Sequence, residues 1–190
     1  ILESNIRLTE ESIKGNLNYR HPNFRYSDRA LSTSLDITET DKLADFGYKS
    51  SLNSISLGTS YEQFENTFFS PRLSISNESL ETTSDASAAY KKQEGTYFDT
   101  SFSYGLTFDK RNSAYQPTSG FYSNWYQQLP IVSENQTIVN GYIITGYKEL
   151  VDDMIISTGI YTRAVNSLSN DDVRVSRRLY VPSSRLRGFE

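Results

Sequence analysis

The 190-residue chain has no cysteine, one histidine, one tryptophan and five prolines. Without cysteine it can form neither a disulfide scaffold nor a thiolate metal site. It also lacks an apolar run long enough for a membrane-spanning helix. A net charge of -4 argues against a dedicated nucleic-acid binder, which normally carries a basic face. The length suits one domain with a substantial core.

Groups that carry out catalysis are equally scarce. His21 stands directly before a proline, and no serine lies in a nucleophile elbow, so we interpret His21 as a turn residue. The acidic pairs Asp152-Asp153 and Asp171-Asp172 lack the spacing of a cation-binding loop and are expected to be solvated. No glycine-rich phosphate loop is present. We therefore expect no enzyme activity and no catalytic, cofactor-binding or metal-binding residues.

Aromatic residues, by contrast, are abundant: 14 tyrosines and 10 phenylalanines favour strands. The clearest strand pattern is "TYFDTSFSYGLTFDK" at 96–110, where apolar and polar residues alternate. Its length suits a tilted strand crossing a bilayer, which needs roughly 9–11 residues. The apolar face carries Phe98, Thr100, Phe102, Tyr104, Leu106 and Phe108, and the polar face Asp99, Ser101, Ser103, Gly105, Thr107 and Asp109.

The same alternation recurs along the whole chain and predicts roughly nine strands and no helix. Between Leu52 and Ile55 the pattern changes phase, which predicts a β-bulge or an early strand end. A mean hydropathy of -0.55 does not exclude a transmembrane β-barrel, because only alternate positions need to be apolar. The other expected strands lie around Asn5–Thr9 and at 12–20, 29–37, 47–61, 71–80, 120–129, 137–150 and 154–165.

The connections are predicted to alternate strictly between short and long. The short ones are 21–28, 63–70, 112–120 and 150–153; the long ones are 38–47, 81–95, 130–136 and the tail from Asn166. An antiparallel meander with short turns at one end and long loops at the other is typical of outer-membrane barrels.

Two motifs with this arrangement resemble the BamA family of outer-membrane assembly proteins. This family belongs to the bacterial surface antigen superfamily, together with two-partner-secretion transporters and mitochondrial sorting proteins. Its mid-barrel aromatic-x-Pro-Thr-x-Gly turn is matched in "DKRNSAYQPTSGFYS". Its Val-Arg-Gly-Phe/Tyr loop motif is matched in "RRLYVPSSRLRGFE", with Leu186 in place of valine. The matching residues are Tyr115, Pro117, Thr118 and Gly120 in the turn, and Arg187, Gly188 and Phe189 in the loop.

The resemblance implies an all-β antiparallel meander that is part of a 16-stranded transmembrane β-barrel. Residues 1–190 would be the middle strands of that barrel domain, forming an open, incomplete barrel and ending in a long extracellular loop at 166–190. The family's loop tip folds into the lumen, so Arg187 would pair with acidic and aromatic residues on later strands, beyond this chain. The turn motif would be periplasmic. A lipid-facing band would comprise Phe98, Phe102, Tyr104, Leu106 and Phe108.

The function that the resemblance implies is folding and inserting β-barrel proteins into the outer membrane of a Gram-negative type of cell, without a cofactor. The expected partners are the lipid bilayer, unfolded barrel clients and, through domains outside this chain, assembly-complex lipoproteins, but no nucleic acid. One alternative is a two-partner-secretion type of outer-membrane transporter or pore. Another is a soluble β-sandwich binding module, whose apolar faces would pack against a second sheet.

Overall fold

The computed structural model describes residues 1–152, 154–169 and 172–179, and these form one antiparallel sheet of nine strands. Each strand pairs with the next in the sequence, so the sheet is a meander with β1 and β9 at its edges. The predicted open meander of nine strands is confirmed. The strands are β1 (Leu2–Leu8), β2 (Ser12–His21), β3 (Ala30–Lys42), β4 (Tyr48–Phe64), β5 (Thr67–Thr82), β6 (Gly95–Asp109), β7 (Ser119–Val132), β8 (Thr137–Val151) and β9 (Met154–Ser167).

The prediction of no helix was wrong for the connections. Two short α-helices, α1 (Leu43–Phe46) and α2 (Ala88–Lys91), lie between strands, and two 3-10 turns, η1 (Phe24–Tyr26) and η2 (Val175–Arg177), complete the elements. Propensity over so few residues gives no periodic signal, because a helix of one turn shows no repeat. None of the helices among the described residues combines the length and apolar character needed to span a membrane.

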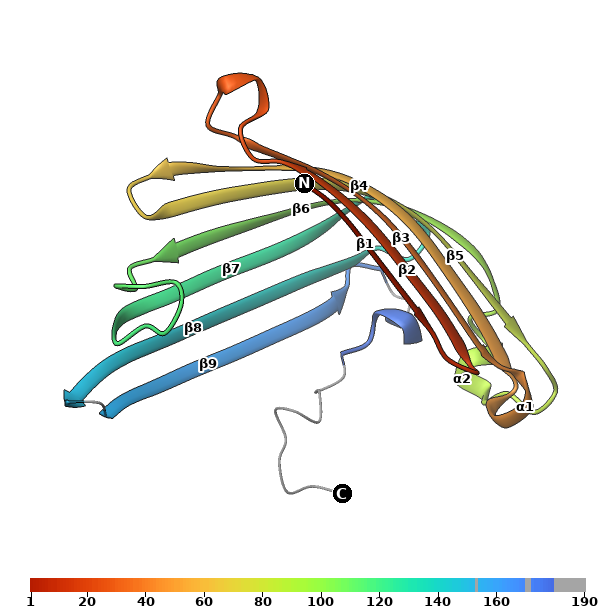
Figure 1. The fold of residues 1–190 in the computed structure, drawn as a ribbon. Coiled ribbons are helices and arrows are strands. Elements are labelled where there is room, and N and C mark those ends of the chain that lie inside the picture. Colours follow the sequence, from red (N-terminus) through yellow and green to blue (C-terminus); the bar gives the residue numbers. More distant parts are fainter. Residues whose placement is uncertain (153, 170–171, 180–190) are drawn as a thin grey trace.

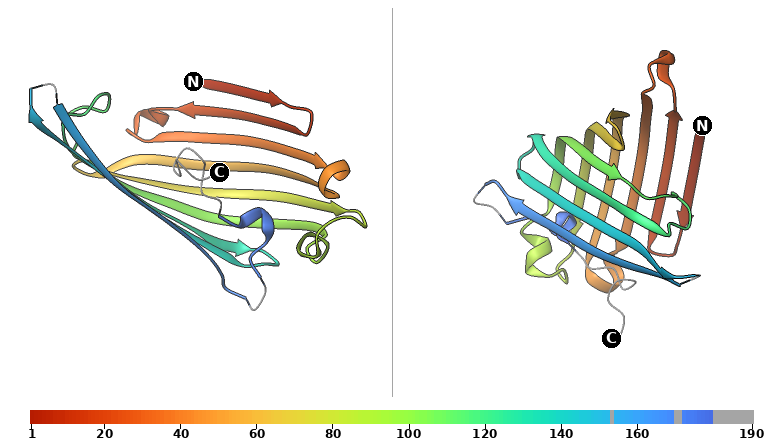
Figure 2. Two further views of the ribbon diagram at one scale, coloured as in Figure 1. Left: turned by 90° about the horizontal axis from the view of Figure 1, so that it is seen from below. Right: turned by 90° about the vertical axis from the view of Figure 1, so that its left-hand side faces the viewer.

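The sheet is strongly curved, and residues 172–179, which include η2, lie on its concave side (Figures 1 and 2). Because successive side chains of a strand point to opposite faces, neighbouring residues separate into two rows. One row, on the convex face, is apolar; the next, on the concave face, is polar. The first row is Leu17, Leu35, Ile55 and Ile75, and the second is Asn16, Asp36, Ser54, Ser76 and Asp99.

Burial follows this division in an unusual way. Among the described residues only Leu80, Ala86 and Val139 are buried apolar residues, whereas the buried polar set is larger, and many large apolar side chains of the convex face stay exposed. The described residues form no second sheet over that face. A β-sandwich, which needs two packed sheets, is therefore excluded. The buried polar residues are Ser34, Ser56, Glu78, Asp99, Ser103 and Arg174.

The predicted strict alternation of short and long connections was wrong in detail. One end of the sheet, the loop end, carries the connections 9–11, 43–47, 83–94 and 133–136 and the segment after β9; the other, the turn end, carries 22–29, 65–66, 110–118 and the connection after Val151. Of the bounded loop-end connections, only 83–94 is longer than every bounded one at the turn end. Strands β3 and β5 continue into polar residues that the sequence suggested were loops, and β7 continues into Pro130, Ile131 and Val132, which were also expected in a loop. Polar residues fit the strand there because the backbone pairing with the neighbouring strands continues.

The bulge predicted between Leu52 and Ile55 is absent, since β4 pairs in continuous register with β3 and β5 across both residues. Leu52 instead points to the concave face, where it lies in register with Glu78. The irregularity that β4 does contain comes later, between Glu62 and Phe64. Because Leu52 is an apolar residue on the concave face, the sequence pattern looked like a change of phase although the strand is regular there.

Candidate functional site

A buried arginine fixes the segment after β9 to the concave face of the sheet. The side chain of Arg174 donates a hydrogen bond from Nη2 to Oδ2 of Asp99, and its Nη1 lies 3.2 Å from Oε2 of Glu78. The second contact is an ion pair without hydrogen-bond geometry, because neither atom has a hydrogen-bond partner. Arg174 is 4% exposed, and both carboxylate residues are 6% exposed. Each buried charge is therefore compensated by an opposite charge.

Strand pairing between β5 and β6 places the two carboxylates for this contact. Glu78 is opposite Tyr97, and Asp99 is opposite Ser76, so both acidic side chains point to the same face from adjacent strands. The guanidinium carbon of Arg174 also lies 4.7 Å from the centre of the Tyr97 ring. A planar cation thus has two carboxylates and an aromatic face around it, a combination that suits arginine better than lysine.

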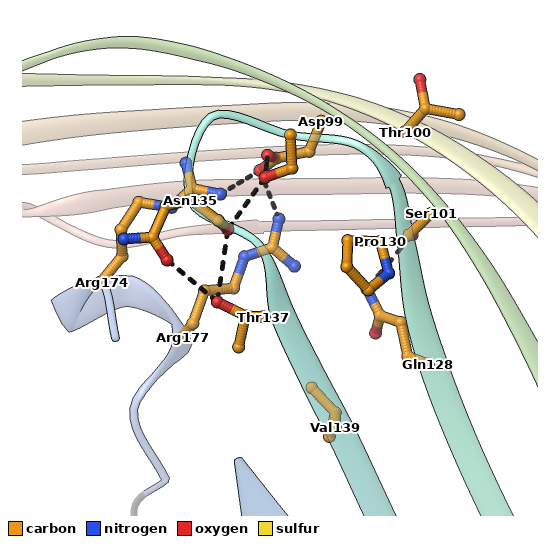
Figure 3. A pocket seen from close by; sticks show the side chains of 11 residues that line it. Asp99, Thr100, Ser101, Gln128, Pro130, Asn135, Thr137, Val139, Arg174 and Arg177 are labelled. Atoms are coloured by element: carbon orange, nitrogen blue, oxygen red, sulfur yellow. Dashed lines mark hydrogen bonds and ion pairs between the residues drawn. The ribbon is translucent and has the colours of Figure 1, made fainter. Parts of the chain in front are cut away.

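A second arginine and a serine complete the cluster. Arg177 donates from Nη2 to the same Oδ2 atom of Asp99 at 2.9 Å, and Ser133 donates its hydroxyl to Oδ1 at 2.5 Å. Figure 3 shows both arginines approaching Asp99 from the segment that carries η2. We call Arg174, Arg177, Asp99 and Glu78 the latch. Two cations and two anions make it neutral overall, which offsets the cost of burial.

Contacts of the loop-end connections hold the same segment. Asn135 donates from its amide to the backbone carbonyl of Asp172 at 2.9 Å, and the backbone amide of Val175 donates to the side chain of Gln93 at 2.7 Å. Lys92 lies 3.9 Å from the Asp172 carboxylate, but both side chains are exposed, so this ion pair adds little. Residues 172–179 are therefore positioned by β5, β6 and two loops together.

The latch is suited to holding a segment in place, and it offers no acid–base pair for catalysis. Within the described ranges, no group of three or more histidine, cysteine or acidic residues could hold a metal ion. A cavity of about 300 Å³ lies beside the latch, lined by Tyr48, Tyr90 and Arg174 among others. Burial there raises the pKa of Tyr90, which keeps the phenol neutral. The cavity therefore adds no charge to the balanced latch.

At the opposite end of the sheet, the connection 110–118 is held by one asparagine. The amide of Asn112 donates to the hydroxyl of Thr118 at 2.8 Å, and its Oδ1 accepts from the backbone amides of Thr118 and Ser119 at 3.0 and 3.1 Å. Gly120 has a φ of +92°, and a Cβ atom there would clash with the carbonyl oxygen of Lys110. Only glycine fits that position without strain.

An ion pair closes the base of the same connection. Arg111 donates to both carboxylate oxygens of Asp109, from Nε at 2.8 Å and from Nη2 at 2.7 Å. This pairing raises the pKa of Arg111. The guanidinium carbon also lies 5.0 Å from the centre of the Tyr122 ring. The turn is thus rigid through local contacts alone.

Comparison with known protein families decides what this architecture is. Residues 2–190 match the model of the Omp85 superfamily domain. The chain belongs to the Omp85 superfamily. The resemblance seen in the sequence is therefore confirmed, and the open meander is that of an Omp85 barrel segment.

Solved structures support the same fold for this Omp85 chain. BamA from Haemophilus ducreyi lacking POTRA domains 1-3 matches with a TM-score of 0.77 and 21% sequence identity. The match covers 93% of this chain and 37% of that one, so the chain spans little more than a third of the similar protein. No curated protein matches the sequence.

The sequence-predicted residues of the Omp85 chain fall into three groups. Tyr115, Pro117, Thr118 and Gly120 lie together at the turn end, where Tyr115 is 80% exposed. The convex face of β6 carries Phe98, Phe102, Tyr104, Leu106 and Phe108, whereas Asp99 lies on its concave face. Arg187, Gly188 and Phe189 lie outside the described residues.

His21 ends β2 and makes an edge contact with the Phe24 ring, with centroids 5.9 Å apart.

Sequence reasoning missed the latch of the Omp85 chain. Asp99 was assigned to the polar face of its strand, and that assignment agrees with the structure, but nothing local identifies its partners 75 and 78 residues later. One signal was available. Glu78 and Asp99 are acidic residues on the concave faces of long neighbouring strands, where a charge without a partner would be costly once covered.

Proposed function

We propose that this Omp85 chain is the middle part of the transmembrane barrel of an outer-membrane assembly factor, which folds β-barrel proteins and inserts them into the outer membrane. Superfamily membership and the BamA-like fold support this proposal. The physical basis is edge complementation: a barrel that opens between its first and last strands offers unpaired backbone groups to a client strand. Such activity needs no cofactor and no covalent chemistry.

The observation that carries the proposal is the latch. Arg174 and Arg177 hold the start of the segment 166–190 against the concave face, the side that becomes the lumen when a barrel closes. An occupied lumen disfavours conduction through an open channel and favours work at the edges of the barrel wall. The latch would be the first anchor of the loop, and Arg187, Gly188 and Phe189 would form a second anchor on strands beyond this chain.

The remaining surfaces of the domain also have a place in the proposed barrel. The domain 1–190 contributes middle strands of a 16-stranded barrel, with the loop 166–190 outside and the turn around Pro117 on the periplasmic side. The lipid-facing band would comprise Phe98, Phe102, Tyr104, Leu106 and Phe108. The partners are the outer-membrane bilayer and unfolded barrel clients, with assembly-complex lipoproteins binding through other domains.

An insertion assay tests the proposal. The complete protein is reconstituted into liposomes, a urea-unfolded outer-membrane barrel protein is added, and its folded fraction is followed by heat-modifiable gel mobility. We expect faster folding of the client than in empty liposomes. We also expect Arg187→Ala to lower the rate, whereas Arg163→Ala, at an exposed position on β9, should leave it unchanged.

A parallel measurement separates the transporter alternative. Liposomes loaded with a fluorescent dye report whether the protein conducts. Rapid dye release without any acceleration of client folding would overturn the assembly function and favour the transporter. Wild-type activity of Arg187→Ala would refute the second anchor alone.

A further inference from the structure

A second arginine on the concave face, Arg72 near the turn end of β5, has a different environment. Its Nη1 donates to the hydroxyls of Ser56 at 2.6 Å and Ser34 at 3.3 Å, and its Nη2 donates to the hydroxyl of Ser32 at 3.2 Å. These bonds use three of the five N–H donors of a guanidinium. Among the described residues the remaining donors, on Nε and Nη2, are left for another acceptor.

No carboxylate among the described residues forms an ion pair with Arg72. Asp36 is connected to it only through Ser34, whose hydroxyl lies 3.3 Å from Oδ2 of that aspartate. Asp36 also accepts a hydrogen bond from Asn16 at 2.5 Å. A guanidinium is charged at any physiological pH, so Arg72 keeps a positive charge that its hydroxyl partners orient but do not neutralise.

The register brings a second arginine to the same place. Arg20 is opposite Ser32, and Gly58 is opposite both Ser32 and Arg72, so a single row crosses four strands on the concave face. Arg72 reaches across β4 to Ser32 on β3. The next strand, β2, carries Arg20, so the guanidinium of Arg72 lies about one strand spacing, roughly 5 Å, from that strand. Arg20 and Arg72 therefore line the same part of the concave face. Between them is a pocket of about 260 Å³, lined also by Asn18, Ser60 and Ser70.

Gly58 forms the floor of this pocket. A Cβ atom at Gly58 would lie 3.1 Å from the carbonyl oxygen of Pro71 and 3.3 Å from the Ser32 hydroxyl oxygen. Any side chain there would therefore displace the serine that holds Nη2 of Arg72. The absence of a side chain keeps the pocket open beneath the two arginines.

We propose that this pocket, formed by Arg72, Arg20 and the surrounding hydroxyls, binds a dissolved oxyanion of the carboxylate or phosphate class. Free N–H donors of a fixed guanidinium match the paired oxygens of such a ligand, and Arg20 supplies a second positive charge. Chloride has no such pair of oxygens to match the N–H donors, so we expect it to bind more weakly than a carboxylate or phosphate. The site therefore discriminates by geometry as well as by charge.

Thermal unfolding of the complete protein in detergent micelles tests the site. Sodium phosphate, sodium acetate and sodium chloride are titrated at matched ionic strength, with intrinsic tryptophan fluorescence as the readout. We expect phosphate, and more weakly acetate, to raise the Tm above the value in chloride. Arg72→Gln should weaken the apparent phosphate affinity about tenfold or more, because charge-assisted hydrogen bonds are lost. Arg20→Gln, at an exposed residue, should weaken it less.

The matched control is Arg163→Gln, which removes the same charge from β9, away from the pocket. It should retain the phosphate response. Equal Tm values in phosphate and chloride for the wild type would overturn the proposal and leave Arg72 as a structural residue. An equal loss of the response in Arg163→Gln would overturn it as well, since screening of net charge would then explain the effect. Arg20→Gln provides the decisive measurement if Arg72→Gln does not fold.

Discussion

Each end of the concave face carries an arginine, but the two side chains have opposite environments. At the loop end, Arg174 is 4% exposed and contacts two carboxylates. At the turn end, Arg72 is half-buried, and its hydrogen-bond partners among the described residues are serine hydroxyls. The first arrangement neutralises the charge and fixes a chain segment. The second orients the charge and leaves it available to a ligand.

The difference shows that burial and pairing, rather than residue type, decide what an arginine contributes. Truncation of a buried, paired arginine leaves its carboxylates without compensation, which is costly. Truncation of a half-buried arginine that contacts hydroxyls leaves no buried charge behind, and the neutral hydroxyls of Ser34 and Ser56 still bond to each other, so the cost is small. Substitutions at these two positions should therefore differ sharply in their effect on stability.

The largest effect is expected for Arg174→Met. It leaves Glu78 buried without its cation and Asp99 with Arg177 as its remaining cation among the described residues, and we expect a loss of about 3–5 kcal/mol in the free energy of unfolding of the complete protein. Urea denaturation measures this loss, and limited proteolysis should show faster cleavage near 172–179. Combining Arg174→Met with Asp99→Asn and Glu78→Gln should recover part of the stability. If Arg174→Met is as stable as Arg163→Met, the latch is not structural.

A charge on the convex face of the middle strands should have the next largest effect. Phe102→Lys places an ammonium group in the proposed lipid-facing band, and we expect a loss of about 2–4 kcal/mol in folding from urea into lipid vesicles. Ser54→Lys is the control, because Ser54 points to the concave face. Equal costs for the two lysines would show that the convex face does not contact lipid.

Within the turn end, Gly120→Ala should be moderately destabilising. The positive φ of Gly120 and the clash with Lys110 predict a loss of about 1–3 kcal/mol. Gly146→Ala is the matched control, since its new Cβ would lie 3.9 Å from the nearest atom, in ordinary contact. Denaturation midpoints of the two variants give the comparison. A Gly120→Ala midpoint equal to that of Gly146→Ala would show that the turn adapts freely.

The smallest effect is expected for Arg72→Met in the absence of oxyanions. The hydroxyls of Ser34 and Ser56 are buried but keep the 2.7 Å hydrogen bond between them, and Ser32 is half-buried, so the free energy of unfolding should change by less than about 1 kcal/mol. Urea denaturation in chloride buffer measures it beside Arg174→Met. A loss as large as that of Arg174→Met would remove the contrast between the two ends.

The sequence predicted the strands of this protein better than its connections. Alternation at 96–110 predicted β6 within one residue and separated Phe98 from Asp99 correctly, because strand geometry is local. Leu52 produced a false bulge, since it is an apolar residue facing inward beside the latch. The loop boundaries failed for a related reason. Polar residues such as those at 38–42 can continue a strand when its pairing partners do.

The site was less accessible to prediction than the fold. The motif residues around Pro117 could be recognised because their turn chemistry is contained in one short segment. The partners of Arg174 could not, since the segment 166–190 that carries it has four further arginines and acidic residues occur throughout the chain. Only the register between β5 and β6 reveals that Glu78 and Asp99 point to the same face.

The latch also has a consequence for the order of folding. Each strand pairs with its sequence neighbour, so the sheet can grow by closing short loops one after another. Arg174, however, meets Asp99 across 75 residues, and Glu78 comes into place only when β5 and β6 are already joined. The ion pairs therefore form late in folding, after β5 and β6 have paired, and their presence indicates that this part of the sheet is complete.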